Sequence, residues 1–138
     1  MVYKKVDLDK VRLQAADIHL LVMDVDGVLT DGHLPFDGQG RECKVFHVRD
    51  GYGIRRVIDA GLEVALISGR NSIPVKKRAD ELGIRHVFLG VKEKLATLQK
   101  LAEKLGIRGT PAIILSNGLV ISGSKDADSL IALIDKSS

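Results

Sequence analysis

Two carboxylates that follow directly on a short apolar run constrain this chain more than any other feature. Residues 20–23 are Leu-Leu-Val-Met, and Asp24 and Asp26 come next, one residue apart. A short run rich in Leu and Val predicts a strand buried on both faces, and ligands of open α/β sheets bind where such strands end. If the backbone stays extended, Asp24 and Asp26 lie on one side, where the pair can attack a substrate and transfer a proton, or hold a cation. An acidic turn without chemistry is the alternative.

Apolar runs alternate with helical patterns along most of the chain. Predicted strands cover residues 19–24, 62–67 and 86–89, and predicted helices cover residues 6–15, 50–60 and 93–105. A further helix has Pro74 in its first turn and ends at Gly83, and Asp50 is the expected cap of the helix 50–60. This alternation predicts an α/β fold class: a single three-layer, Rossmann-like domain over residues 1–138 with a mainly parallel sheet.

Two segments depart from this alternation. Residues 29–48 carry glycine and proline among alternating apolar positions, which predicts a β-hairpin flap that projects from the sheet; an ordinary exposed ribbon is the alternative. Asn117 and Gly118 separate the apolar runs 112–115 and 119–122 and are a strong signal for a two-residue turn. The C-terminal part is therefore expected to be an antiparallel hairpin followed by a helix.

Composition excludes several classes of function. The 138 residues are 45% hydrophobic, enough for one core, and only 4% are aromatic. The net charge of +3 comes from interspersed Lys and Arg, which argues against nucleic-acid binding. The charge suits an anionic small substrate, but is equally an ordinary solvated surface. The lone Cys43 rules out an internal disulfide. No apolar run has the length of a signal peptide or membrane span, which predicts a cytoplasmic protein without membrane contact.

Four short motifs, in a fixed order, resemble one enzyme family. They are DVDGVLTDG at residues 24–32, FHVRDGYGI at 46–54, ISGR at 67–70 and LGVKEK at 89–94. Their order and spacing are similar to those of the haloacid dehalogenase superfamily phosphatases. The likeness is to the small tetrameric branch that acts on 3-deoxy-octulosonate and acylneuraminate phosphates, the 3-deoxy-D-manno-octulosonate 8-phosphate phosphatase branch. The resemblance covers residues 10–107.

This resemblance implies a catalytic mechanism and the residues that perform it. Asp24 would be the nucleophile that forms an aspartyl-phosphate intermediate, and Asp26 the acid and base that serves the leaving oxygen and then water. Ser68 and Gly69, at a predicted strand end, would hold phosphate oxygens together with Lys94. The expected partner is an anionic, phosphorylated small molecule.

The flap and the assembly are expected to complete the pocket. Arg49 is a candidate to pair with a carboxylate of the substrate as a bidentate fork, and Arg70 is a weaker candidate for the same anion. Surface arginine is the alternative for both residues. Because the flap reaches a neighbouring subunit in the resembled family, a homotetramer is the expected assembly.

The expected cofactor is Mg²⁺, but its site is incomplete. In the resembled family Asp24, the backbone carbonyl of Asp26 and a late acidic motif share the cation. That motif, Gly-Asp-Asp, does not occur after residue 107. Magnesium affinity is therefore expected to be reduced, and catalysis to be weakened with it.

The C-terminal part resembles a different family. Residues 109–123 read GTPAIILSNGLVISG, and residues 108–135 are similar to the end of a thioredoxin-fold bacterial disulfide isomerase. The resemblance implies a cis bond at Thr110-Pro111 and a strand at 112–115 that joins the sheet of residues 20–24. Such a change of family indicates a chimera, natural or engineered. Two functions follow: a weakened Mg-dependent phosphomonoesterase acting on a sugar-acid phosphate, or a recombined α/β protein without catalytic activity.

Overall fold

The computed structural model describes residues 18–107, together with residues 9, 12, 13, 16, 113–114 and 120–121. The chain divides into two compact units: one is His19–Gly106, and the other combines Met1–Ile18 with Ile107–Ser138. The boundary after Gly106 lies next to residue 107, where the resemblance to the phosphatases ends. That residues 1–138 form a single domain stays a prediction.

Three parallel strands form the sheet of the unit His19–Gly106. They are β1 (Leu20–Met23), β2 (Glu63–Ile67) and β3 (His86–Phe88), paired in the order β1-β2-β3. Leu21 lies opposite Val64 on the next strand, and Ala65 lies opposite His86. Parallel neighbours need a crossover connection between them, and helices supply it here. The predicted α/β fold class with a mainly parallel sheet is confirmed.

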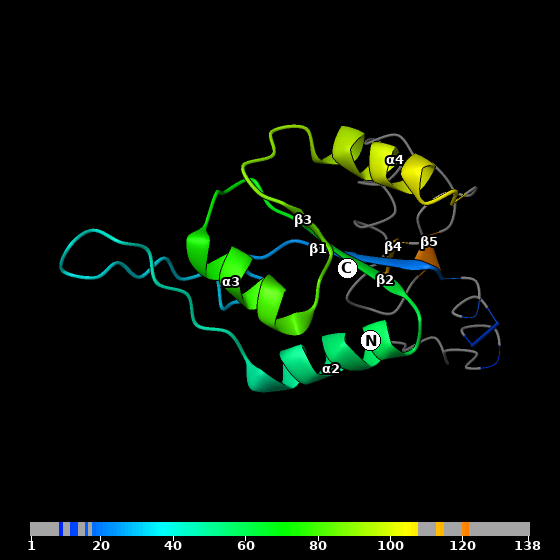
Figure 1. Ribbon diagram of the computed structural model, residues 1–138, viewed down its shortest axis with the longest axis horizontal. Coiled ribbons are helices and arrows are strands. Elements are labelled where there is room, and N and C mark those ends of the chain that lie inside the picture. Colours follow the sequence, from blue (N-terminus) through cyan, green and yellow to red (C-terminus); the bar gives the residue numbers. More distant parts are fainter. Residues whose placement is uncertain are drawn as a thin grey trace, which may run out of the picture. The chain divides into compact units, whose positions relative to one another are not determined.

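Helices cover both faces of this sheet. They are α2 (Val48–Asp59), α3 (Ile73–Leu82) and α4 (Lys94–Lys104). Figure 1 shows α2 and α3 on one face and α4 on the other, which is the predicted three-layer, Rossmann-like arrangement. Within the described part of the chain, no helix combines the length and the apolar composition that a membrane span requires.

The core joins the sheet to α2 and α3 and also fixes the loop after β1. Its buried members are Val25, Leu29, Ile54, Val64, Leu66, Val75, Ala79, Leu82 and Ile84. Val25 is completely buried, although it lies between the carboxylates Asp24 and Asp26. Burying a valine side chain contributes about 1.5–3 kcal/mol. The position of both carboxylates is therefore tied to the packing of the core.

The helix α2 begins differently from the prediction. His47, not Asp50, is its N-cap: the His47 backbone is extended, and its ring Nδ1 accepts a hydrogen bond from the backbone N–H of Arg49 at 3.1 Å. Asp50 lies in the first turn, where a carboxylate is favourable beside the positive end of the helix dipole. The prediction that Asp50 caps this helix is therefore wrong. Pro74 and Gly83 lie at the start and end of α3 as predicted, and Gly83 adopts the left-handed φ of 72°.

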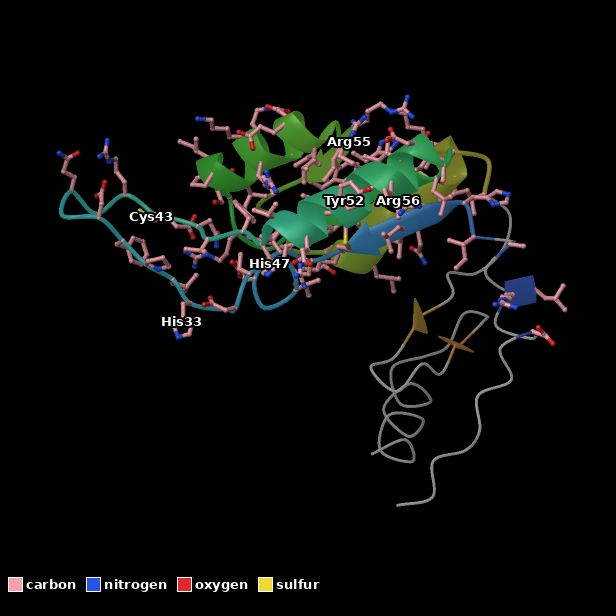
Figure 2. All side chains as sticks on the ribbon, turned by 90° about the horizontal axis from the view of Figure 1, so that it is seen from below. His33, Cys43, His47, Tyr52, Arg55 and Arg56 are labelled. Atoms are coloured by element: carbon pink, nitrogen blue, oxygen red, sulfur yellow. The ribbon has the colours of Figure 1, made fainter. Side chains whose placement is uncertain are left out.

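Residues 29–48 form the predicted flap. Figure 1 shows this segment projecting from the layered part of the unit, and Figure 2 shows His33 and Cys43 on it, away from the helices. Its β pairing is limited to one antiparallel bridge, Phe36 with Glu42. At the tip, the Asp37 carboxylate accepts hydrogen bonds from the backbone N–H groups of Gln39 and Arg41, at 2.8 and 2.9 Å. The flap is thus a narrow hairpin held by a side-chain turn.

The C-terminal hairpin is confirmed where the structure describes it. The strands β4 (Ile113–Ile114) and β5 (Val120–Ile121) pair antiparallel in a two-stranded sheet of their own. The predicted pairing of residues 112–115 with the sheet of residues 20–24 is not found among the described residues. The predicted cis bond at Thr110-Pro111, the closing helix and most of the predicted helix 6–15 lie outside the described residues.

Candidate active site

Asp24 lies where β1 ends, as the sequence predicts. Its Oδ1 accepts a hydrogen bond from the backbone N–H of Val25 at 2.7 Å. Its Oδ2 accepts one from Lys94 Nζ at 2.6 Å, although the two residues are 70 positions apart. Lys94 is the first residue of α4, directly after the loop that follows β3. The carboxyl ends of parallel strands meet at one edge of a sheet, and this edge therefore places a lysine on the first carboxylate.

The backbone turns away from the direction of β1 directly after Asp24. The carbonyl of Val25 accepts hydrogen bonds from the backbone N–H groups of Leu29 and Thr30, at 2.8 and 3.3 Å. The Thr30 hydroxyl accepts another from Gly27 N–H at 3.2 Å, and Gly27 has the left-handed φ of 79°. The chain thus leaves the extended conformation at Val25. The condition under which Asp24 and Asp26 would share one side is not met.

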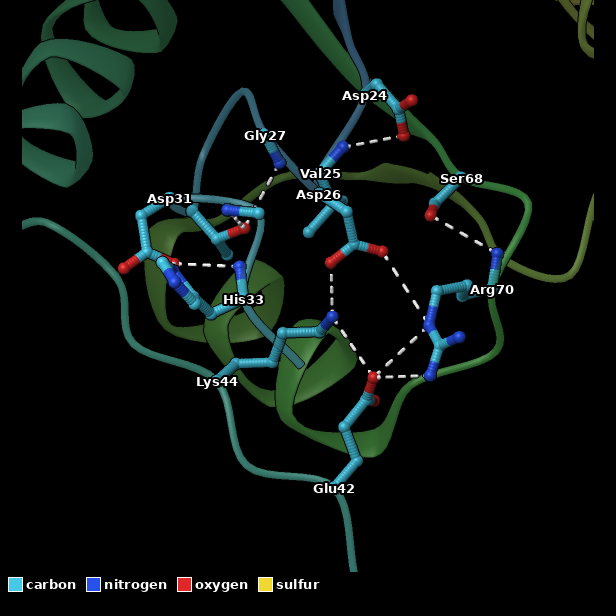
Figure 3. A network of polar contacts seen from close by, with 12 residues as sticks. Asp24, Val25, Asp26, Gly27, Asp31, His33, Glu42, Lys44, Ser68 and Arg70 are labelled. Atoms are coloured by element: carbon cyan, nitrogen blue, oxygen red, sulfur yellow. Dashed lines mark hydrogen bonds and ion pairs between the residues drawn. The ribbon is translucent and has the colours of Figure 1, made fainter. Parts of the chain in front are cut away.

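Asp26 instead belongs to a network of four charged side chains, drawn in Figure 3. Its Oδ1 pairs with Lys44 Nζ, and its Oδ2 lies 3.8 Å from Arg70 Nε. Glu42 completes the group, because its Oε1 lies 3.1 Å from Lys44 Nζ and 3.0 Å from Arg70 Nη2. Two carboxylates and two cations balance one another. The flap supplies Glu42 and Lys44, the loop after β1 supplies Asp26, and the turn after β2 supplies Arg70.

The environment of Lys44 keeps this side chain charged. Burial lowers the pKa of Lys44, but hydrogen bonds to Asp26 and Glu42 outweigh that effect, so the pKa is raised above its ordinary value. The raised pKa is the expected consequence of two anionic partners at contact distance. Lys44 therefore remains an ammonium group at neutral pH.

The pKa of Glu42 is shifted in the opposite direction. The Ser72 hydroxyl is the largest influence that lowers it, burial opposes this, and Lys44 and Arg70 lower it further. However, Ser72 Oγ is buried and makes no hydrogen bond of ordinary distance and angle. The ion pairs at 3.1 and 3.0 Å are therefore the firmer cause of the lowered pKa.

The turn after β2 places Ser68, Gly69 and Arg70 at the same edge of the sheet. Ser68 is buried, and its backbone N–H donates to the carbonyl of Phe88 at 2.9 Å. Its hydroxyl accepts a hydrogen bond from the backbone N–H of Arg70 at 3.4 Å. Figure 3 shows Ser68 beside the end of β1, near Asp24. The turn is therefore held by the neighbouring strand, and the Ser68 hydroxyl lies at this edge of the sheet.

The structure brings most of the predicted site residues to one edge and leaves one apart. Asp24, Asp26, Ser68, Gly69, Arg70 and Lys94 all follow the ends of β1, β2 and β3. Arg49, in the first turn of α2, is exposed, and its side chain makes no ion pair with any described residue. A role for Arg49 in substrate binding stays a prediction.

Sequence reasoning missed Glu42 and Lys44. A signal for them existed, because residues two apart in an extended segment face the same side. Both are charged, and they flank the exposed Cys43. The alternation predicts that the two side chains share one side of the flap, but it does not predict that this side faces the site.

The donor set fits a magnesium ion in part. Carboxylate and carbonyl oxygens from Asp24 and Asp26 are the hard ligands that Mg²⁺ prefers, and water commonly fills its remaining positions. Within the part of the chain that the structure describes, no three His, Cys, Asp or Glu side chains gather into a metal-binding group. The site therefore offers two protein residues to the cation.

Comparisons with known proteins point to one kind of enzyme. No protein-family model matches the chain. It is 40% identical over 112 residues to a 3-deoxy-D-manno-octulosonate 8-phosphate phosphatase of Yersinia pestis, which covers 81% of the chain and 60% of that protein. It is 46% identical over 97 residues to the same phosphatase of Escherichia coli BL21-DE3, which covers 70% of the chain and 52% of that protein. The chain is similar to these phosphatases. It spans little more than half the length of the relatives that it matches.

Solved structures of such phosphatases share the fold. One from Moraxella catarrhalis, in complex with a magnesium ion, a phosphate ion and KDO, superposes with a TM-score of 0.69 and 42% identity, covering 73% of this chain and 58% of its own. A cobalt-bound phosphatase from Haemophilus influenzae superposes with a TM-score of 0.62 and 45% identity, covering 66% and 53%. These comparisons give no support to the resemblance between residues 108–135 and disulfide isomerases, and a chimera is not inferred from them.

Proposed function

We propose that this chain hydrolyses the phosphomonoester of a sugar acid through an aspartyl-phosphate intermediate on Asp24. The observation that carries the proposal is the contact of Lys94 Nζ with Asp24 Oδ2 at 2.6 Å, at the edge that also holds Asp26 and Ser68. The similarity to 3-deoxy-D-manno-octulosonate 8-phosphate phosphatases, at 40% identity over 112 residues, supports the same reaction. Together they favour 3-deoxy-D-manno-octulosonate 8-phosphate as the substrate to test first.

The reaction has two displacement steps. In the first, a carboxylate oxygen of Asp24 attacks phosphorus in line, the P–O bond to the sugar breaks, and Asp26 gives its proton to the departing alkoxide. In the second, water attacks phosphorus while Asp26 takes its proton, and the bond between phosphorus and Asp24 breaks. Inorganic phosphate leaves, and both carboxyl groups return to their starting states.

Several groups are placed to hold the phosphate. Lys94 supplies a positive charge, Ser68 supplies its hydroxyl, and Gly69 supplies its backbone N–H at a strand end. Fixed donors of this kind stabilise the charge that develops on the equatorial oxygens. A magnesium ion held by Asp24 and Asp26 would add positive charge against the phosphate oxygens, and its affinity is expected to be low because the described residues offer no third carboxylate.

Arg70 is the better placed of the two arginines proposed to bind the sugar acid. Its guanidinium is about half exposed and lies on Glu42 at 3.0 Å. A substrate carboxylate that forms a fork with Arg70 would replace Glu42 as its partner. Arg49 would contribute only if the substrate or a neighbouring subunit reaches it.

A homotetramer remains part of the proposal. Phe36 and Val45 lie on the flap and are 58% and 71% exposed. Large apolar side chains on a projecting segment are suited to contact with a second copy of the chain. The flap would then contribute to a pocket that assembly completes.

The alternative is a folded chain without catalytic activity. The absence of the Gly-Asp-Asp motif and the unit boundary at Gly106 favour it. In this case the phosphatase residues persist as part of a stable α/β core but do not turn over a substrate.

The deciding experiment is a phosphate-release assay at high protein concentration with added Mg²⁺, using 3-deoxy-D-manno-octulosonate 8-phosphate and p-nitrophenyl phosphate. Asp24→Asn is expected to lower turnover by at least about 10³-fold, because an amide is a poor nucleophile. Asp80→Asn, which changes an exposed carboxylate on α3, is the matched control and should retain full activity. Activity that survives in Asp24→Asn would refute the mechanism, and an inactive native chain would favour the alternative.

A further inference from the structure

Lys44 is the most deeply buried charged side chain at the site, and it comes from the flap. Only 1% of its side chain is exposed, whereas its neighbour Val45 is 71% exposed. A buried ammonium group is unfavourable unless anionic partners compensate for its lost hydration. Lys44 has two such partners, Asp26 and Glu42. Its side chain is therefore held in one place, although the segment that carries it projects from the fold.

The two oxygens of Asp26 are in different situations. Oδ1 is bound by Lys44, whereas Oδ2 lies 3.8 Å from Arg70 Nε, which is beyond hydrogen-bond distance. Figure 3 shows these contacts on opposite oxygens of the carboxylate. The ion pair with Lys44 therefore holds Oδ1, and Oδ2 is the oxygen of Asp26 that makes no hydrogen bond with a described residue.

Glu42 holds the cations of this arrangement in place. Its Oε1 contacts both Lys44 and Arg70, at 3.1 and 3.0 Å, and its side chain is 13% exposed. Without Glu42, Lys44 would retain a single anionic partner. The pair Glu42 and Lys44 thus connects the flap to the residue that moves protons in the proposed reaction.

We propose that Lys44 is a positioning residue: it anchors Oδ1 of Asp26 from the flap, so that Oδ2 serves as the proton-exchanging oxygen, and Glu42 supports the anchor. This inference rests on the proposed function. It assigns the flap a part in proton transfer, beyond covering the site. General acid–base catalysis depends on the reach and direction of the carboxyl group, and small displacements cost much of it.

The test compares two esters that differ in their need for a proton. An alkyl phosphate such as 3-deoxy-D-manno-octulosonate 8-phosphate requires protonation of its leaving oxygen, whereas p-nitrophenolate leaves without it. Lys44→Met is expected to lower kcat/KM, which reports only the steps up to release of the alcohol, by about 10²-fold or more for the alkyl ester and by less than about 10-fold for the aryl ester. Lys44→Arg should restore part of the loss, and Lys100→Met, an exposed lysine of α4, is the control that should change neither ester.

Two further measurements keep the test decisive. If Lys44→Met does not fold, Glu42→Gln replaces it in the comparison. Its activity should also fall more on the alkyl ester than on the aryl ester, but by a smaller factor than in Lys44→Met. Thermal unfolding of Lys44→Met, Asp26→Asn and the double variant tests the contact without activity, and the double variant should lose less than the sum of the single ones. Equal losses on both esters, or additive unfolding effects, would overturn the positioning role while leaving the phosphatase proposal intact. A native chain inactive on both esters would overturn the two together.

Discussion

Glu42 gives the site a measurable dependence on pH. Its pKa in the folded chain is lowered from the ordinary value of 4.5. A lowered folded-state pKa contributes stability that is fully present above the unfolded-state pKa and is lost as the pH falls through the folded-state value. We therefore expect native protein to unfold at a higher temperature than Glu42→Gln at pH 7, and the difference to shrink below about pH 4.5.

Differential scanning calorimetry of both proteins from pH 3 to pH 7 checks this prediction. Glu103→Gln, on an exposed position of α4, is the control and should show no comparable narrowing. If the difference in unfolding temperature between native protein and Glu42→Gln stayed constant from pH 3 to pH 7, the pKa of Glu42 would not be lowered by its ion pairs.

The individual residues of the site differ in how far the sequence predicts them. Asp24 is predictable because it directly follows a buried strand whose end lies at the ligand-binding edge. Lys94 is predictable only through the resemblance of its motif, because a lysine at the start of a helix is by itself more often solvated. Lys44 is not, because its burial depends on how the flap packs, and a charged residue in a glycine-rich segment ordinarily faces water. The turn between Asp24 and Asp26 is also missed. The prediction that both lie on one side assumes an extended backbone, and the chain turns at Val25, whose side chain packs in the core.

At the scale of elements, two glycines of the helical layer should respond to alanine in opposite ways. Gly53 is exposed within α2, and a Cβ there meets nothing within 4 Å. Gly53→Ala should stabilise the chain by about 0.5–1 kcal/mol, because glycine loses more backbone entropy in a helix. Gly83 ends α3 with a φ of 72°, and a Cβ would lie 2.7 Å from Arg55 Nη1. Gly83→Ala should destabilise it by about 1–2 kcal/mol.

Urea denaturation followed by circular dichroism measures both effects through the shift of the midpoint. The comparison is informative because the same substitution is made twice in one unit. If Gly53→Ala also destabilised the chain, the side of α2 that carries Gly53 would have to pack against something outside the unit His19–Gly106.

Element boundaries follow from the sequence to within a few residues, and the exceptions have physical reasons. An apolar run that ends at Asp24 predicts β1, apolar runs next to glycine predict β2 and β3, and Pro74 with Gly83 bracket α3. The start of α2 is missed because an imidazole can accept the capping hydrogen bond as a carboxylate does, and His47 precedes Asp50 along the chain. The sequence predicts that the flap is a hairpin, but it does not predict that its β pairing is limited to one bridge. Glycine and proline weaken strand pairing, and composition alone does not say by how much.

At the scale of the whole molecule, magnesium binding tests how complete the site is. The described residues offer Asp24 and Asp26 alone, and Lys94 already lies on Asp24. Isothermal titration calorimetry of the native chain with MgCl₂ should therefore show a Kd on the order of 1 mM or weaker, as for other cation sites with few charged ligands. Asp24→Asn should abolish the remaining heat. Micromolar affinity in the native chain would reveal a ligand beyond the described residues.

The contact between Lys94 and Asp24 also sets an order of events during folding. Asp24 and Lys94 are 70 positions apart, and the chain between them includes two complete crossovers, so closing this contact costs loop entropy that no local contact offsets. A nascent chain that has produced β1 and β2 already contains Asp24, the proposed nucleophile, but not yet Lys94, its cationic partner. The topology therefore brings Asp24 and Lys94 together only after the three-stranded sheet has assembled, so the proposed chemistry would require the whole of this sheet.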